Sequence, residues 1–151
     1  MKIRTGFVSN SSSSSFCVFG CPVPNNRDAT FNHIKKYMTE ENFIEMHSWK
    51  DEVKPEYKKL YKEIQKFDCY DEASDGLEIE DSKLLDEVIS DLSHEILTYV
   101  GNCQFYVGLE PSQGRDDETF KEFKERAKKL ADDLIGKSHG NLAWECDAYY
   151  D

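Results

Sequence analysis

The sequence predicts an α+β fold: a small antiparallel or mixed sheet, made of an N-terminal strand, a hairpin and a C-terminal strand, packed with about four to five helices. Three observations predict it. The 151 residues suit one domain, 1–151, with a core of its own. Aromatic residues make up 13% of the chain, which excludes wholesale disorder. Runs of segments whose apolar residues recur at helical spacing stand between β-rich runs that are not adjacent in the sequence.

The first half of the chain is expected to contain one strand followed by helices. The short apolar run at 16–19 (FCVF) predicts a buried strand, and the turn-rich residues 20–30 predict a loop. Apolar residues three and four apart predict a helix from 31 to about 49, with a break near Thr39. Another helix is expected to begin at Pro55, which suits a first helical turn.

The second half is expected to begin with an acidic loop at 68–81, because few residues there can join a core. Asp81 or Ser82 then caps the next predicted helix. Three further elements follow: a hairpin of 96–100 and 103–109 around Gly101-Asn102, a helix over 117–135, and a final strand within 141–150.

The charge balance restricts the classes of partner. The chain carries 19 basic against 30 acidic residues, a net charge of −11. Direct binding to nucleic acid or to an anionic membrane needs a positive footprint and is therefore not expected. The basic N-terminus lacks the apolar run of a secretory signal, and no stretch has the length of a membrane span. We therefore expect a cytoplasmic protein.

The five cysteines are expected to be small buried thiols. They stand at 17, 21, 69, 103 and 146, an odd number at irregular spacing, which is a poor disulfide framework. Cys17 and Cys21 with a distant pair of ligands would make a zinc site, but the C-x3-C spacing and the scattered histidines favour thiols. No metal and no cofactor is predicted.

An acidic tract within 68–91 holds most of the net charge. Its members are Asp68, Asp71, Glu72, Asp75, Glu78, Glu80, Asp81, Asp86, Glu87 and Asp91, and Lys83 is the only base among them. A calcium loop beginning at Asp71 fails, because Ala73 and Ser82 stand where ligands belong. The tract is either a solvated face or a binding surface for a basic partner, including an imitation of nucleic-acid phosphates.

The serine-rich lead at 1–15 has a simple and a sharper interpretation. The simple one is a flexible segment of low complexity. The sharper one is a cradle for an anion, or a site of modification, at the edge of a strand. No glycine-rich phosphate loop and no nucleophile elbow occurs in the sequence, and no catalytic residue is predicted.

Three segments resemble a family of small proteins found mainly in tailed bacteriophages and prophages. Residues 4–16 (RTGFVSNSSSSSF) match the family's opening, 106–111 leads through 116–119 into a helix, and Trp144 precedes a closing DAYYD. The resemblance implies a phage accessory protein of the bacterial cytoplasm, and it carries over no catalytic residue. The candidate shared-motif residues are Ser9, Asn10, Ser11, Ser12, Ser13, Asp116, Asp117, Glu118, Thr119, Trp144, Tyr150 and Asp151.

Three functions follow from these observations. The favoured one is a non-enzymatic protein that binds a basic surface on a host protein through the acidic tract, as an inhibitor of host machinery or of a defence system. The second is a small enzyme or small-molecule binder, with a site formed by the serine run, Asp116–Thr119 and the C-terminal tail. The third is a component of the virion or of its assembly.

Overall fold

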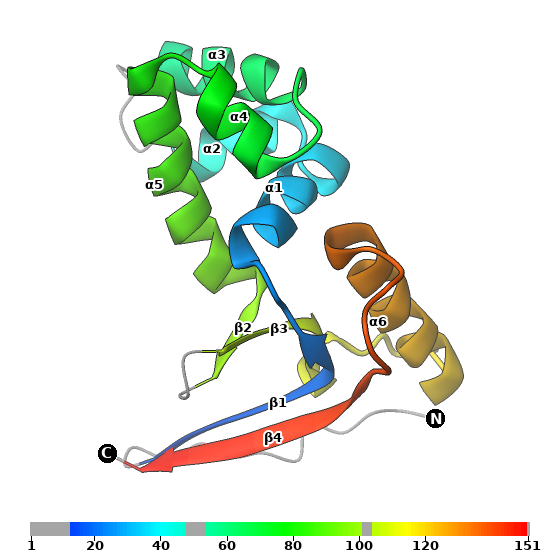
Figure 1. Cartoon of the computed structure of the whole chain (residues 1–151). Helices are drawn as coiled ribbons and strands as arrows, with labels where there is room; N and C mark the ends of the chain where they lie inside the picture. Colours follow the sequence, from blue (N-terminus) through cyan, green and yellow to red (C-terminus); the bar gives the residue numbers. More distant parts are fainter. Residues whose placement is uncertain (1–12, 48–53, 101–103, 151) are drawn as a thin grey trace. The chain divides into compact units, whose positions relative to one another are not determined.

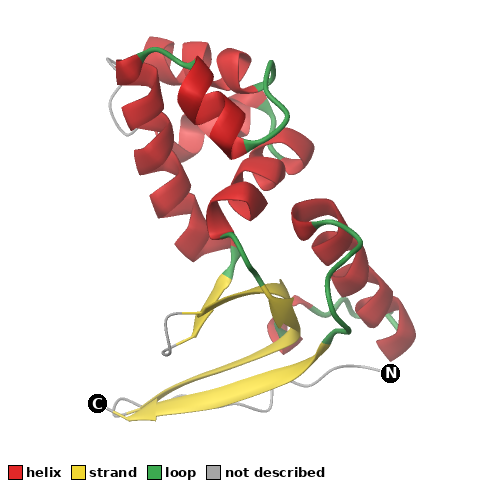
Figure 2. Cartoon of the chain, in the orientation of Figure 1, coloured by secondary structure: helices red, strands yellow, loops and turns green. Residues whose placement is uncertain are grey.

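The computed structural model describes residues 13–47, 54–100 and 104–150 (Figure 1). The chain divides into two compact units, unit 1 (Met1–Pro24 with Ile96–Asp151) and unit 2 (Asn25–Glu95). Unit 1 contains the sheet, and unit 2 is built of helices (Figure 2). The α+β fold class predicted from the sequence is confirmed.

Four strands form the antiparallel sheet of unit 1. They are β1 (Ser13–Pro22), β2 (Thr98–Val100), β3 (Gln104–Leu109) and β4 (Ala143–Tyr150), in the order β2-β3-β1-β4. The N-terminal strand, the hairpin strands and the C-terminal strand are thus all confirmed. β1 is longer than the four residues predicted because its serines pair with β4, as in Ser13↔Tyr150. The turn predicted at Gly101-Asn102 lies outside the described residues.

Two glycines let β1 and β3 approach closely. Gly20 and Gly108 are register partners in the ladder. A Cβ on Gly20 would lie 1.9 Å from the carbonyl oxygen of Val107, and a Cβ on Gly108 would lie 2.1 Å from that of Phe19. Both contacts are with backbone, which cannot swing aside, so each position requires a residue without a side chain.

Helix α6 (Phe120–Ile135) covers this sheet and confirms the helix predicted over 117–135. It begins three residues later than predicted because Thr119 caps it: the Thr119 hydroxyl accepts a hydrogen bond from the Glu122 N–H, and the Glu122 carboxylate accepts one from the Thr119 N–H. Its inward residues Phe123 and Ala127 are fully buried against Phe19 and Leu109.

Cys17 and Cys146 correct the prediction that all cysteines are thiols. They face each other across the β1–β4 ladder and form a disulfide, with the Cα atoms 4.1 Å apart. Their separation of 129 residues hid the pair, because only strand register brings them together. Cys21 is a buried free thiol as predicted, and burial raises its pKa. Cys69 is a half-buried thiol, and Cys103 lies outside the described residues.

The described residues of unit 2 contain five α-helices: α1 (Asn26–Tyr37), α2 (Glu40–His47), α3 (Lys54–Ile64), α4 (Tyr70–Gly76) and α5 (Ile79–Ile96). Their shared core includes Phe31, Ile34, Phe43, Leu60, Ile64, Leu85, Ile89 and Leu92. The break predicted near Thr39 is confirmed, since Thr39 Oγ1 accepts a hydrogen bond from the N–H of Asn42 in the first turn of α2.

The loop predicted at 20–30 is wrong at both ends. β1 continues to Pro22, and α1 begins at Asn26. The side chain of Asn25 accepts hydrogen bonds from the N–H groups of Arg27 and Asp28, so it starts the helix. This capping residue was visible in the sequence, but the surrounding turn formers concealed it.

The acidic loop predicted at 68–81 is also wrong, because most of it is helical. α4 spans Tyr70–Gly76, and α5 begins at Ile79 rather than at Asp81 or Ser82. Only two residues of α4, Tyr70 and Ala73, are buried. A helix of seven residues with so small an apolar side gives no periodic signal, and packing against the unit 2 core stabilises it.

Candidate functional site

The acidic tract is a helical surface of unit 2. Nine of its ten carboxylate residues are exposed, and Asp81 is half-buried. The short helix α4 and the first three turns of α5 position most of them, and the buried residues of these helices include Tyr70, Ala73, Leu85 and Ile89. Acids in the first turn of each helix also lie at the positive end of its dipole. This favourable interaction stabilises both helices despite their many negative charges.

Part of the acidic tract is neutralised inside the unit. Lys59 Nζ lies 3.2 Å from a carboxylate oxygen of Asp81 and 3.8 Å from one of Glu78. The hydrogen bond with Asp81 raises the pKa of Lys59. The Tyr70 hydroxyl donates to Asp86, and burial together with this bond raises the pKa of Tyr70. These contacts hold α4 and the start of α5 in place and leave less charge for a partner.

The remaining carboxylates are unpaired. Within the described residues, six have neither an ion pair nor a side-chain hydrogen bond: Asp68, Asp71, Asp75, Glu80, Glu87 and Asp91. Ile79 lies in the same stretch, between Glu78 and Glu80, and is 75% exposed. It is the most exposed of the large hydrophobic side chains in the described part of the chain. A single exposed apolar side chain is common on protein surfaces, but this one lies among unpaired acids, where it adds an apolar contact point to a charged surface.

The calcium loop rejected from the sequence has no structural counterpart, because residues 71–76 lie in a helix. Across residues 13–47, 54–100 and 104–150, no group of three or more His, Cys, Asp or Glu side chains is placed to hold a metal ion. In the same residues no helix has the length and apolar character needed to cross a membrane.

The candidate shared-motif residues divide between two parts of unit 1. Strand pairing places Ser13 beside Tyr150 at one end of the β1–β4 ladder. Trp144 pairs with Phe19, six residues away along the same ladder, which corresponds to about 20 Å. There its ring stacks with those of Phe120 and Phe123, at centroid distances of 6.3 and 6.0 Å. Residues 9–12 and 151 lie outside the described residues.

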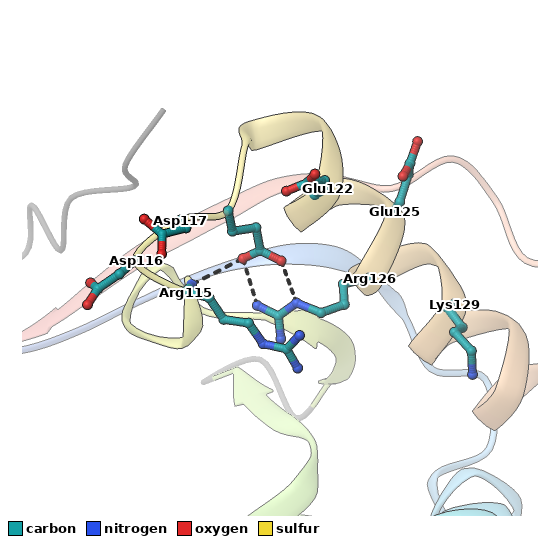
Figure 3. A pocket seen from close by; sticks show the side chains of 8 residues that line it. Arg115, Asp116, Asp117, Glu122, Glu125, Arg126 and Lys129 are labelled. Atoms are coloured by element: carbon teal, nitrogen blue, oxygen red, sulfur yellow. Dashed lines mark hydrogen bonds and ion pairs between the residues drawn. The ribbon is translucent and has the colours of Figure 1, made fainter.

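The other shared-motif residues, Asp116–Thr119, line or adjoin a cavity of about 590 Å³ beside α6. Figure 3 shows its labelled residues: Arg115, Asp116 and Asp117 come from the loop before α6, and Glu122, Glu125, Arg126 and Lys129 from the helix itself. Five acids and three bases line it. Such a lining gives no ligand of one sign a clear advantage.

Glu118 and Arg126 form a structural brace in this cavity. Arg126 Nε donates to Glu118 Oε1 at 2.7 Å, and Nη2 donates to Glu118 Oε2 at 2.9 Å and to the Gln113 carbonyl at 2.7 Å. The Arg115 N–H adds a bond of 3.1 Å to Glu118. Hydrogen bonding to Arg126 lowers the pKa of Glu118 to about 2. The brace fastens the loop to α6, and it occupies Nε and Nη2 of Arg126.

Several shared-motif residues thus have roles in folding. Thr119 caps α6, Glu118 holds the loop before it, and Trp144 closes the aromatic cluster over α6. Comparison of the chain with protein-family models, with curated proteins and with solved structures gives no match. The function is therefore argued from the surfaces themselves.

Proposed function

We propose that this chain is a non-enzymatic binding protein that engages a basic surface on a partner protein through the acidic tract of unit 2. The observation that carries the proposal is the combination of six exposed, unpaired carboxylates with Ile79, three-quarters exposed between two acids. Carboxylates without internal partners are available for the lysines and arginines of another protein. An exposed isoleucine is available for an apolar pocket.

The two features have different physical effects on binding. Unpaired charges of one sign create a field that accelerates encounter with a basic surface and orients it. A buried apolar side chain supplies affinity, because its transfer from water stabilises the complex while rim charges contribute little. The partner that fits is a protein whose basic residues surround a small apolar pocket. A basic surface that normally binds nucleic-acid phosphates meets this description, so the acidic tract would act as their substitute.

The resemblance to phage accessory proteins adds a setting to this proposal. In that setting the partner is a host protein of the bacterial cytoplasm, and binding inhibits host machinery or a defence system. The Cys17–Cys146 pair provides a test of location, because a reducing cytoplasm keeps such a pair as thiols. Acid quenching of intact cells, followed by alkylation of the unfolded protein and mass spectrometry, would find both thiols modified if the protein is cytoplasmic, and an intact disulfide would contradict that location.

The test of the binding surface is capture of partners from nuclease-treated bacterial lysate with three proteins. One is the natural chain, and one carries Asp75→Asn, Glu80→Gln and Glu87→Gln. The control neutralises three exposed acids of unit 1, Asp116→Asn, Asp117→Asn and Glu145→Gln. We expect a partner that the natural chain and the control capture and the acidic-tract variant loses. Loss with the control alone, or capture that is equal with all three, would refute the proposal.

With the partner purified, kinetics separate the two effects. Neutralising the three acids should lower the association rate constant by about tenfold at low salt and flatten its salt dependence. Ile79→Ser should instead raise the dissociation rate and leave the association rate nearly unchanged, because it removes the anchor and no charge. If the Ile79→Ser variant bound with natural affinity, Ile79 would not be part of the interface.

A further inference from the structure

A second pocket, in unit 1, has the opposite charge from the rest of the chain. Its volume is about 560 Å³, within the range of small-molecule sites. One wall is the outer face of α6, with Lys121, Lys124 and Lys128. The other is the segment after the helix, with Lys137 and Leu142, and Phe19 of β1 also lines the pocket.

Lysines dominate this pocket although the chain has a net charge of −11. Four lysines line it against a single carboxylate, Glu125. Lys121 lies 3.9 Å from Glu125, and Lys128 lies at the same distance from Asp132, which are loose and exposed pairs. Lys124 and Lys137 have no acidic partner among the described residues. The pocket therefore offers more positive charge than its own acids neutralise.

The ring of Phe19 lines the pocket, and the rings of Phe120 and Trp144 adjoin Phe19. The Lys124 ammonium stands 4.9 Å from the centroid of the Phe120 ring and 6.0 Å from that of Phe19. Leu142 packs against the same cluster. Phe120 is parallel to the partly exposed indole of Trp144, with 2° between the ring planes. A ligand here would meet apolar carbon and ammonium groups together.

The second wall is held in place by its own contacts, which distinguishes the pocket from the ordinary lysine face of one helix. Gly136, at φ 84°, turns the chain back after α6. His139 then fastens the segment: Nε2 lies 2.5 Å from a carboxylate oxygen of Asp132, and Nδ1 lies 2.7 Å from the carbonyl oxygen of Gly140. Both partners are acceptors, so a ring nitrogen that carries a proton donates to its partner. Lys137 is thereby brought opposite the lysines of α6.

We propose that this pocket binds a nucleoside di- or triphosphate. Several converging ammonium groups suit an anion with more than one charge, and compact lysine charges suit phosphate. Phe19 and Leu142, the apolar side chains that line the pocket, suit a planar base joined to those phosphates. An extended nucleic acid is disfavoured, because phosphates beyond the pocket would meet a predominantly acidic chain. This site is separate from the acidic tract of unit 2, and neither proposal depends on the other.

The test is titration of the full chain with ADP by calorimetry at low and moderate salt. We expect saturation below about 1 mM, and ADP binding at least tenfold tighter than pyrophosphate or adenosine alone. Lys124→Gln with Lys137→Gln should weaken ADP binding by about tenfold or more. The matched control, Lys129→Gln with Lys83→Gln, removes two exposed lysine charges that do not line the pocket and should change affinity less than twofold.

Each result bears on a defined part of the proposal. The replaced lysines are exposed, so both double variants should keep the natural unfolding transition, which circular dichroism checks. No saturable ADP binding would overturn the proposal, as would equal weakening in the two double variants. Pyrophosphate binding as tight as ADP binding would overturn the role of Phe19 and Leu142 in binding the base, and with it the nucleotide.

Discussion

Phe123 is the side chain on which the core of unit 1 most directly depends, and Phe123→Ala is expected to lower the free energy of unfolding by about 3–5 kcal/mol. The ring is fully buried. Its centroid lies 6.4 Å from that of Phe19 and 6.0 Å from that of Trp144, so strand residues hold the neighbouring rings. They cannot close the space that truncation leaves, and the loss therefore includes a cavity as well as the transfer of the ring.

Phe120→Ala is the matched control for this variant. Phe120 lies one turn earlier in α6, and the change of residue type is identical, but its ring is only half-buried. The expected loss is about 1–2 kcal/mol, because water already covers part of the ring. The difference between the two variants then measures burial, since any change in helix propensity is similar in both.

Urea unfolding followed by tryptophan fluorescence measures both losses. With Trp49→Phe as background, Trp144 is the only tryptophan in the chain. At a slope of about 2 kcal/mol per M, the Phe123→Ala midpoint should fall by roughly 1.5–2.5 M and that of Phe120→Ala by less than about 1 M. Equal shifts, or a Phe123→Ala loss below about 1 kcal/mol, would refute the burial of Phe123 between the sheet and α6.

Three further predictions concern unit 1. Gly20→Ala should cost more than about 2 kcal/mol, because its Cβ would meet backbone at 1.9 Å, and Gly140→Ala, with nothing within 4 Å, should be near neutral; similar costs would contradict the close approach of β1 and β3. The hydrogen bond from Arg126 holds the pKa of Glu118 at about 2, below its ordinary 4.5. The resulting stabilisation is present above about pH 5 and is lost as the pH falls toward 2, so Glu118→Gln should flatten that acid limb of stability, and an unchanged limb would argue against the brace. Cys146→Ser should lower stability by about 3–4 kcal/mol without reductant, and a dithiol reductant should abolish the difference, which denaturation in both conditions measures.

The strands and the longer helices were predictable because their signals are local. α6 has apolar residues on one side, a capping threonine before it and glycine after it, and all of these lie within one stretch of chain. The strands at the two ends were marked by β-rich composition. α4 was missed because its two buried residues are too few for a periodic pattern, and only packing in unit 2 makes it helical.

The two candidate sites differ in how far the sequence predicts them. The acidic tract could be identified from composition, but which of its carboxylates remain unpaired depends on where α3 places Lys59. The sequence does not indicate the lysine pocket, since lysines are common on the outer face of an amphipathic helix. They become one side of a cavity only because the chain reverses at Gly136 and His139 fixes its return.

The sequence by itself determined the charge of this protein, its α+β class and the positions of its main helices and strands. These depend on composition and on interactions between residues a few positions apart. The tertiary structure alone decided the Cys17–Cys146 disulfide, the contact of Gly20 with the facing strand, and the cavity beside α6. Each joins residues from separate segments of the chain, and such proximity follows from strand register and helix packing, which no local pattern encodes.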